Sequence, residues 1–347
     1  MKRILVTRFS AMGDVAMVAS VLREFQEQHT DTEIIMVSRP FFSAFFDGIP
    51  RLIFHPIDPK GKHKGLPGLL KLFKELKKYR VKQVADLHNN IRSRFLDILF
   101  RTSGYQVQIL DKGRPEKKAL TRTKDKVFKP LKLTTERYAD VFRKLGYALQ
   151  LSHQLEKQHR LIPQGMMPIL ASNAKKIGIS AFAQHPYKVL SKEKMTAVIR
   201  SLNDLGVQIV LFGGGAKEKE ITENWEKEFT NVHSVVGKYN LSQELDIIAH
   251  LDLMISMDSS GMHMASLMGI PCISIWGATH PYAGFLGYGQ SMDDCVQVEH
   301  PNRPNSVYGN KSCLCEGVEA IDLISSEMVV ERVKKTLIFI RFTRLIT

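Results

Sequence analysis

Two segments place side chains with reactive chemistry at turns that follow short apolar runs. In the first, Asp14 comes after the run 3–7 and a loop of small residues. A carboxylate at such a turn can act as a general base that takes a proton from an attacking hydroxyl. Aspartate is also a favoured helix N-cap, and the helix dipole stabilises its anion and so lowers its basicity. The sequence leaves both interpretations of Asp14 open.

The second segment follows the apolar run 253–256 and is rich in small and hydroxyl residues. It consists of Asp258, Ser259, Ser260, Gly261, Met262 and His263. Small residues at a strand-to-helix turn expose backbone N–H groups, and these can hold a phosphate with help from the helix dipole. The segment therefore predicts a diphosphate site. The same residues would also make a good helix cap, and His263 alone is more often typical of a structural histidine.

Two further positions carry candidate ligand chemistry. The run 207–212 leads into three glycines, Gly213 to Gly215, which can let a nucleotide approach the backbone. The alternative is a flexible loop before a charged helix. Lys188 can offer a cation to a phosphate leaving group, or it can be an ordinary surface lysine.

These segments need a scaffold, and the hydrophobic pattern predicts an α/β protein. Short β-branched runs alternate with longer amphipathic segments, which is the βαβ pattern of a parallel sheet. The nine runs are residues 3–7, 33–38, 84–87, 106–110, 176–180, 207–212, 232–235, 253–256 and 272–276. We predict two doubly wound domains, 1–160 and 175–325. The segment 326–347 is predicted to be a helix that packs back on the first domain.

Composition limits the class of protein. With 347 residues, 44% of them hydrophobic, the chain is long enough for two globular domains, and disorder is excluded. The net charge of +14 is uneven, because residues 1–150 carry 30 basic and 15 acidic side chains while the remainder has a net charge of −1. Four cysteines, no leader pattern and no long apolar stretch predict a cytoplasmic protein without a membrane span.

The basic surplus includes an amphipathic segment after Pro67. Its predicted apolar face consists of Leu69, Leu70, Phe73 and Leu76, and its lysines 71, 74 and 78 lie away from that face. Such a helix either packs on the core or lies on an anionic membrane surface. Nucleic acid is not expected as a partner, since no aromatic residues interleave with the basic ones.

Other chemistries find little support. Cys313 and Cys315 are separated by one residue and lack a second pair with zinc spacing, so no metal site is expected. The G-x-G-x-x-G dinucleotide motif, the G-x-S-x-G hydrolase motif and a D-x-D cluster are all absent from the sequence.

The two ordered motifs together resemble glycosyltransferase family 9, the lipopolysaccharide heptosyltransferase family, along essentially the whole chain. Residues 4–15, I-L-V-T-R-F-S-A-M-G-D-V, resemble its amino-terminal signature. Asp258 and His263, followed by G-I-P at 269–271 and W-G-A-T-H-P at 276–281, resemble its donor signature.

The resemblance implies a GT-B fold, in which two Rossmann-like domains with parallel sheets face a central cleft. It implies that the first domain binds the acceptor, with Ser10, Met12 and Gly13 on the acceptor side, and that the second binds a nucleotide-sugar donor. Asp14 would be the general base, and Lys188 would stabilise the diphosphate. Residues 258–263 with Gly213 and Gly214 would contact the donor, and Glu218 or Glu220 would approach the ribose.

We therefore expect an inverting glycosyltransferase that needs no metal and no cofactor. The expected donor is a nucleotide-diphosphate sugar, with ADP-heptose as the candidate. The expected acceptor is an anionic lipopolysaccharide-type glycolipid at the cytoplasmic face of the inner membrane. The protein is also expected to make peripheral contact with that membrane surface. The alternatives are a non-catalytic nucleotide- or sugar-binding protein of the same fold and a nucleotide-sugar epimerase.

Overall fold

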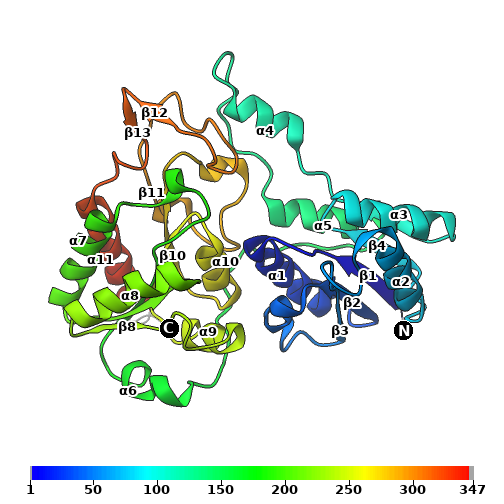
Figure 1. Ribbon diagram of the computed structural model, residues 1–347, viewed down its shortest axis with the longest axis horizontal. Coiled ribbons are helices and arrows are strands. Elements are labelled where there is room, and N and C mark those ends of the chain that lie inside the picture. Colours follow the sequence, from blue (N-terminus) through cyan, green and yellow to red (C-terminus); the bar gives the residue numbers. More distant parts are fainter. Residues whose placement is uncertain (1, 344–347) are drawn as a thin grey trace. The chain divides into compact units, whose positions relative to one another are not determined.

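The computed structural model describes residues 2–343, which divide into two compact units. Within these residues the first unit consists of 2–114 and 132–153, and the second of 115–131 and 154–343 (Figure 1). No helix in the described part of the chain is both long enough and apolar enough to cross a bilayer.

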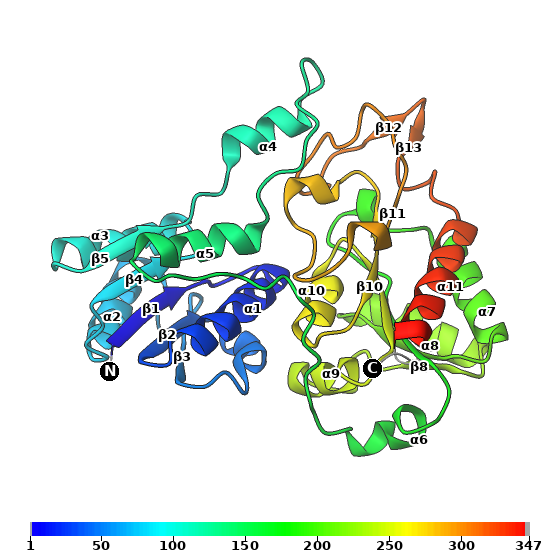
Figure 2. The ribbon, with the colours of Figure 1, turned by 180° about the vertical axis from the view of Figure 1, so that it is seen from behind.

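The first unit contains a five-stranded parallel sheet in the order β3-β2-β1-β4-β5. Its strands are β1 (Lys2–Thr7), β2 (Thr32–Ser38), β3 (Leu52–Pro56), β4 (Gln83–Asp86) and β5 (Gln106–Ile109). Its helices are α1 (Met12–Gln28), η1 (Pro40–Phe46), α2 (Gly65–Lys77), α3 (Ile91–Thr102) and α5 (Thr134–Lys144), and α4 (Arg114–Thr121) begins at its border. Helices α2 and α3 pack side by side, as do α1 and α5 (Figures 1 and 2).

The second unit contains a six-stranded parallel sheet in the order β11-β10-β9-β6-β7-β8. Its strands are β6 (Lys176–Ser180), β7 (Gln208–Phe212), β8 (Val232–Ser234), β9 (Leu253–Met257), β10 (Cys272–Trp276) and β11 (Cys295–Gln297). Its longer helices are α7 (Lys192–Asp204), α8 (Ala216–Glu228), α9 (Leu241–Ile248), α10 (Ser260–Leu267) and α11 (Ser326–Thr343). Short elements complete it: α6 (Met167–Leu170), η2 (Gln164–Met166), η3 (Pro186–Lys188), η4 (Pro281–Ala283), η5 (Met292–Asp294) and the hairpin β12 (Leu314–Cys315) and β13 (Val318–Glu319).

Both sheets have the strand order of the Rossmann fold. Each begins with its central strand, β1 or β6, adds two strands on one side, and then crosses to the other side through β4 or β9. Ligands of open α/β sheets bind beyond the carboxyl ends of the strands at this reversal. All nine predicted strands are present, and the α/β prediction is confirmed.

The sequence missed β3 and β11 because both are weak strands at the edges of their sheets. β3 is only partly buried and ends in Pro56, and β11 has only three residues. An edge strand needs little apolar surface, so its hydrophobic pattern is faint.

Helix α2 packs on the core of the first unit, with a face shifted from the predicted one. Leu69 and Leu76 are buried as expected, but Leu70 is 42% exposed and Leu72 is fully buried in its place. The helix begins at Gly65, two residues before Pro67. Its apolar stripe therefore stabilises the fold and is not available to a membrane.

The chain enters the second unit earlier than the predicted boundary. Residues 115–131 belong to it, and there Lys126 Nζ donates to the Pro301 carbonyl at 2.7 Å and the Leu131 N–H donates to the Tyr282 carbonyl at 2.9 Å. This segment carries six basic and two acidic side chains. The net charge of the first unit is consequently +11, not the +15 of residues 1–150.

The C-terminal helix α11 also belongs to the second unit. It packs on α7, and its Val329, Val330 and Val333 are buried in that unit's core. This packing differs from the prediction that the segment 326–347 packs back on the first domain. The reason is that these valines, together with the apolar side chains of α7, are buried in the core of the second unit. Residues 344–347 of that predicted segment lie outside the described residues.

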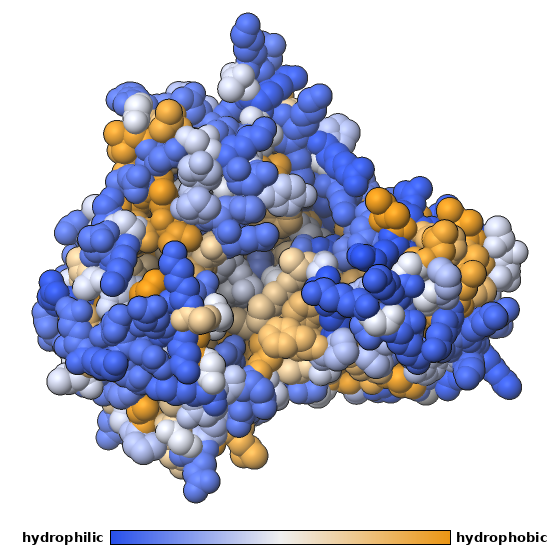
Figure 3. Space-filling view, in the orientation of Figure 1, coloured by the Kyte–Doolittle hydropathy of each residue, from blue (hydrophilic) through white to orange (hydrophobic). Residues whose placement is uncertain are grey.

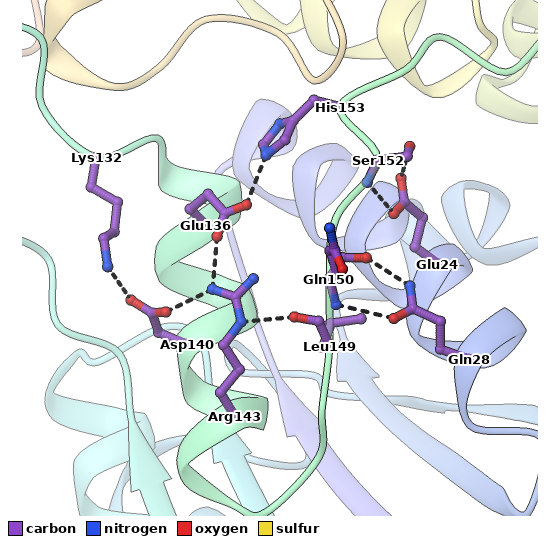
Figure 4. Close-up of polar contacts among 10 residues, drawn as sticks. All are labelled: Glu24, Gln28, Lys132, Glu136, Asp140, Arg143, Leu149, Gln150, Ser152 and His153. Carbon is purple, nitrogen blue, oxygen red and sulfur yellow. Dashed lines mark hydrogen bonds and ion pairs between the residues drawn. The ribbon is translucent and has the colours of Figure 1, made fainter.

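A network of polar contacts closes the first unit where its last segment runs over α1 and α5 (Figure 4). The Arg143 guanidinium contacts Glu136 at 2.7 Å and Asp140 at 2.8 Å, and its Nε donates to the Leu149 carbonyl at 2.8 Å. Burial by itself raises the pKa of Glu136 and Asp140, but hydrogen bonds from basic neighbours outweigh it and hold both pKa values below the usual range. Two ionised carboxylates of α5 therefore fix the Arg143 guanidinium, which anchors the last segment through the Leu149 carbonyl.

The same segment is held to α1 by uncharged donors, two of which bond to the charged Glu24 carboxylate. Gln28 and Gln150 exchange hydrogen bonds of 2.7 and 3.0 Å, and Ser152 donates to the Glu24 carboxylate from its backbone N–H and its hydroxyl. These contacts fix the chain before it leaves the first unit (Figure 4).

Replacement of Arg143 by methionine is expected to lower the free energy of unfolding by about 1–2 kcal/mol at neutral pH, because three acceptors lose a charged donor. The pKa values of Glu136 and Asp140 are depressed in the folded state, so the difference is fully present above their ordinary values of 4.5 and 3.8 and shrinks as the pH falls. Chemical denaturation across a pH series measures it.

The matched control is Lys2→Met, which removes an ion pair with Asp31 whose side chains are 68% and 61% exposed. Solvent screens that pair, so a loss below about 0.5 kcal/mol is expected. If the two variants lost the same free energy of unfolding, the Arg143 network would stabilise the protein no more than an exposed ion pair does.

Candidate active site

The predicted site residues form two groups, each beyond the carboxyl ends of the two strands where its sheet reverses. In the first unit these strands are β1 and β4, and Asp14 lies beyond β1. In the second unit they are β6 and β9, which lead to Lys188 and to Asp258. This position is the one at which open α/β sheets bind ligands.

Asp14 lies in the third position of α1 and not at its N-cap, which is Ala11. Its Oδ2 accepts the Ala11 backbone N–H at 3.3 Å, so the carboxylate supports the helix start from inside the first turn. The capping interpretation therefore holds in a modified form. The side chain is 25% exposed, which leaves it accessible to a ligand. Ser10, Met12 and Gly13 surround it in the turn and are all partly exposed.

Arg8 and Tyr138 hold the Asp14 carboxylate from its buried side. Arg8 Nη2 lies 2.5 Å from Asp14 Oδ2, and Arg8 Nη1 donates to the Leu87 carbonyl at 2.8 Å. The Tyr138 hydroxyl donates to Asp14 Oδ1 at 3.3 Å, and its ring lies 5.8 Å from the guanidinium carbon. Burial raises the pKa of Tyr138 far above its ordinary value, so it stays a neutral donor. The carboxylate has a fixed direction and a permanent counter-ion.

A second group of polar side chains supports the loop that carries Arg8. Asp86, at the end of β4 and fully buried, accepts hydrogen bonds from the Thr7 hydroxyl at 3.1 Å, the Ser93 hydroxyl at 2.7 Å and the His88 backbone at 2.8 Å. His88 Nδ1 accepts the Phe9 backbone N–H at 3.0 Å. The ends of β1 and β4 are thereby tied together just behind the Asp14 turn.

Burial sets the protonation of two groups in this support. It lowers the pKa of His88 to about 4, with the charge of Arg8 as the next cause, so the imidazole is neutral at pH 7 and can accept at Nδ1. Burial, together with the neighbouring Asp86, raises the pKa of Asp97 to about 9. Asp97 therefore stays protonated at neutral pH.

The sequence did not single out Arg8 or Tyr138. Arg8 directly follows an apolar strand and lies in the predicted turn that leads to Asp14, and this position could have indicated that it contacts the Asp14 carboxylate. Tyr138 lies 124 residues from Asp14 in sequence and reaches it only because α5 packs on α1. No local pattern could have found it.

In the second unit, α10 begins directly after β9 and packs unusually close to the sheet. A Cβ at Gly261 would lie 2.4 Å from Ser180 Cβ and 2.9 Å from Ser256 Oγ, so glycine is required there. Ser259 is the N-cap residue and its hydroxyl lies 3.2 Å from that of Ser256. The N–H groups of the first turn of a helix have no carbonyl of their own helix to pair with, and these are suited to hold an anion.

The side chains of this turn do not all face outward. Ser259 and Ser260 are partly exposed, whereas Met262 is fully buried and His263 is 6% exposed. Met262 is a core residue, so only its backbone can face a ligand.

Lys188 and Asp258, which the sequence proposed separately, form an ion pair. Lys188 Nζ lies 2.8 Å from Asp258 Oδ2, and the Thr279 hydroxyl donates to the same oxygen at 2.8 Å. The side chains are 15% and 9% exposed. Lys188 is therefore held at the edge of the sheet beside the α10 turn and is not a free surface lysine.

The glycine-rich turn separates its two candidate carboxylates. Glu218 Oε2 accepts the Gly214 N–H at 2.7 Å, which folds this side chain back over the loop next to Gly213. Glu220 lies further along α8 and is exposed. Gly215 has a φ of +85°, and a Cβ at Gly214 would meet nothing within 4 Å, so the loop surface is open.

Among the described residues, no group of three or more histidine, cysteine, aspartate or glutamate side chains is arranged to hold a metal ion. Cys313 and Cys315 are buried free thiols, and burial raises the pKa of Cys313 to about 11. They pack in a small cluster with Ala278 and Ala320.

Two Rossmann-like units in one chain, each with polar groups at its sheet reversal, define the GT-B architecture found among glycosyltransferases. The model of glycosyltransferase family 9 (heptosyltransferase) matches residues 69–312, and the chain belongs to this family. The predicted family and GT-B fold are confirmed.

Relatives of the chain agree with this assignment. It is 24% identical to the lipopolysaccharide core heptosyltransferase OpsX of Haemophilus influenzae over 87% of this chain and 86% of the relative. Its fold resembles a glycosyl transferase family 9 structure from Veillonella parvula, with a TM-score of 0.75, 19% identity and 97% of both chains covered. It also resembles the E. coli heptosyltransferase WaaC with ADP, with a TM-score of 0.66, 18% identity and coverage of 96% and 99%.

The close packing of α10 gives a test of the second group. Gly261→Ala is expected to lower the free energy of unfolding by about 1–3 kcal/mol, because the new methyl group overlaps Ser180 on β6 and the sheet cannot move aside. Thermal or urea denaturation of the purified protein measures the change.

Gly214→Ala is the matched control, since its Cβ would meet nothing within 4 Å. It is expected to change stability by less than about 0.5 kcal/mol. A Gly261→Ala variant as stable as this control would contradict the close approach of α10 to β6.

Proposed function

We propose that this glycosyltransferase is a metal-independent inverting enzyme that moves heptose from a nucleotide diphosphate onto a lipopolysaccharide-type glycolipid. The observation that carries the proposal is the Asp14 carboxylate, which is 25% exposed and is held in one direction by Arg8 and Tyr138 at the end of the central strand. A base needs this combination of fixed geometry and access.

In the proposed reaction, an Asp14 oxygen takes the proton of an acceptor hydroxyl as that oxygen attacks the anomeric carbon of the donor sugar. The bond from the anomeric carbon to the diphosphate oxygen breaks in the same displacement, so the configuration inverts. Arg8 and Tyr138 fix the direction of the carboxylate, so the contribution of Asp14 comes from its position against the hydroxyl.

The second unit supplies the groups that would stabilise the departing diphosphate. The N–H groups at the start of α10 and the Lys188 ammonium lie beyond neighbouring strands of one sheet. Asp258 orients the ammonium through the 2.8 Å ion pair, so little conformational entropy is lost when the anion binds. Positively charged and N–H groups aimed at developing negative charge stabilise the transition state.

The names of the relatives support the choice of substrates. OpsX is a lipopolysaccharide core heptosyltransferase, and WaaC has been solved with ADP. We accordingly propose ADP-heptose as donor and a lipopolysaccharide precursor as acceptor, at the cytoplasmic face of the inner membrane. Glu218, already held over the glycine-rich turn by the Gly214 N–H, is the better placed carboxylate for the ribose hydroxyls.

Asp14→Asn is expected to lower kcat by about 1000-fold, since a positioned base contributes roughly 100- to 10,000-fold. The affinity for the donor is expected to stay within about twofold, because the donor groups lie in the other unit. Product formation on purified glycolipid by mass spectrometry and donor binding by calorimetry measure the two quantities.

Asp31→Asn, an exposed aspartate of the same unit, serves as control and is expected to keep full activity. Transfer by the Asp14→Asn variant at the normal rate would exclude Asp14 as the base. If the unaltered protein binds donor but forms no product, it is the non-catalytic binding protein, and an epimer formed from donor alone would identify an epimerase.

Lys188→Met is expected to lower kcat by about 100- to 1000-fold, because the diphosphate loses a cation in the transition state. Lys175→Met is the matched control. Lys175 pairs with Asp252 at 3.2 Å before the amino ends of the same two strands, at the opposite edge of the sheet. Both variants lose a lysine from an aspartate pair, so an equal fall in kcat would mean that Lys188 acts only through stability.

A further inference from the structure

The first unit has an open hollow that the proposed chemistry does not use. Its volume is about 1000 Å3, and it lies between the first turns of α2 and α3 and the segment that follows β5. All the residues that line it belong to the first unit.

Aliphatic side chains are exposed around this hollow to a degree that is unusual for a protein in water. Ile91 is 91% exposed, Leu66 is 60% exposed and Ile98 is 58% exposed. Ile91 and Ile98 are seven residues apart, so they lie on one face of α3. Figure 3 shows this apolar surface over α2 and α3, bordered by hydrophilic residues. A contiguous apolar surface with a polar border is typical of an interaction site.

The polar part of the lining is cationic. Arg92, Arg94, Lys112 and Arg114 contribute to it, and none of the lining residues is acidic. Burial and the neighbouring charges of Arg8 and Arg114 lower the pKa of Lys112, which indicates that positive charge is crowded here. The first unit as a whole carries +11. The surface therefore combines exposed aliphatic groups with an excess of cations.

We propose that this surface docks the protein on an anionic lipid bilayer. Leu66, Ile91 and Ile98 enter the boundary between head groups and acyl chains, and the arginines with Lys112 contact the lipid phosphates. An amphipathic surface of this kind buries its apolar side chains about 5–10 Å into the bilayer and gains further affinity from anionic lipids.

The choice of a bilayer over a polyanion rests on the apolar half of the surface. Phosphates of nucleic acid would satisfy the arginines, but they would leave Ile91 and Ile98 in water, and single-stranded nucleic acid is usually bound by stacking on aromatic rings. Phe95, the aromatic residue of the lining, is only partly exposed. The membrane contact that the sequence analysis gave as one interpretation of α2, through its apolar face with the lysines near phosphates, is thus moved to the adjoining first turns of α2 and α3.

The proposal is tested by sedimentation of the full chain with vesicles that contain no glycolipid. Vesicles of phosphatidylglycerol and phosphatidylcholine are expected to bind the protein, and pure phosphatidylcholine vesicles are expected to bind it at least tenfold less. Binding to the anionic vesicles should fall as salt is added, since salt screens charges near the surface.

Two double variants separate the apolar and cationic contributions. Ile91→Asp with Ile98→Asp is expected to lower the partition coefficient at least tenfold. Arg92→Glu with Arg94→Glu is expected to lower it at least 25-fold, at about fivefold for each cation lost. These side chains are exposed, and acidic residues at 91, 92 and 94, in the first turn of α3, suit its dipole, so the thermal midpoints should stay close to that of the unaltered protein.

The matched controls change similar residues in the second unit. Leu161→Asp alters an aliphatic side chain that is 87% exposed, and Lys192→Glu with Lys217→Glu reverses two exposed cations. Both controls are expected to bind vesicles as the unaltered protein does.

Retention of vesicle binding by both hollow variants overturns the proposal. So does equal loss in the control variants, which would make the effect one of net charge or general surface polarity. Binding only when glycolipid is added to the vesicles also overturns it, because the hollow would then be an acceptor site, and a loss confined to RNA binding would identify a nucleic-acid surface. None of these readouts measures sugar transfer, so failure here is distinct from failure of the proposed reaction.

Discussion

The site depends on a constraint that every open parallel sheet obeys. Where the strand order reverses, the connections after two neighbouring strands leave toward opposite faces, and no helix covers the edge between them. This chain contains that reversal twice, at β1 with β4 and at β6 with β9. The proposed base lies at the first reversal, and the proposed diphosphate groups lie at the second.

At each reversal the important charge is held by an opposite charge that is more deeply buried. Arg8, 8% exposed in its side chain, pairs with Asp14, and Asp258, 9% exposed, pairs with Lys188. A buried ion is costly unless it is paired and hydrogen-bonded, and here the Leu87 carbonyl and the Thr279 hydroxyl supply the further bonds. The arrangement fixes the geometry of both charged groups, which suits a transfer in which two substrates must be aligned.

The sequence predicted the scaffold well because its signals are local. An apolar β-branched run followed by a small-residue turn identified β1 with Asp14 and β9 with the α10 turn. Features that depend on packing between distant segments were missed, and Tyr138 is the clearest of them. The burial of Leu72 in place of the predicted Leu70 on α2 has the same origin. The helix packs against both the sheet and α3, and periodicity alone does not predict which side of the helix faces each of them.

Residues 115–131 belong to the second unit although the chain on both sides of them belongs to the first, so a single boundary near residue 150 does not separate the two units. The chain crosses from one unit to the other three times, after residues 114, 131 and 153. A fragment that ends near residue 153 would carry seventeen residues whose partners, among them Phe285 beneath Lys117 and Tyr282 beside Leu131, are missing. Dissecting this protein into halves would therefore require Arg114 to be rejoined to Lys132 by a short linker.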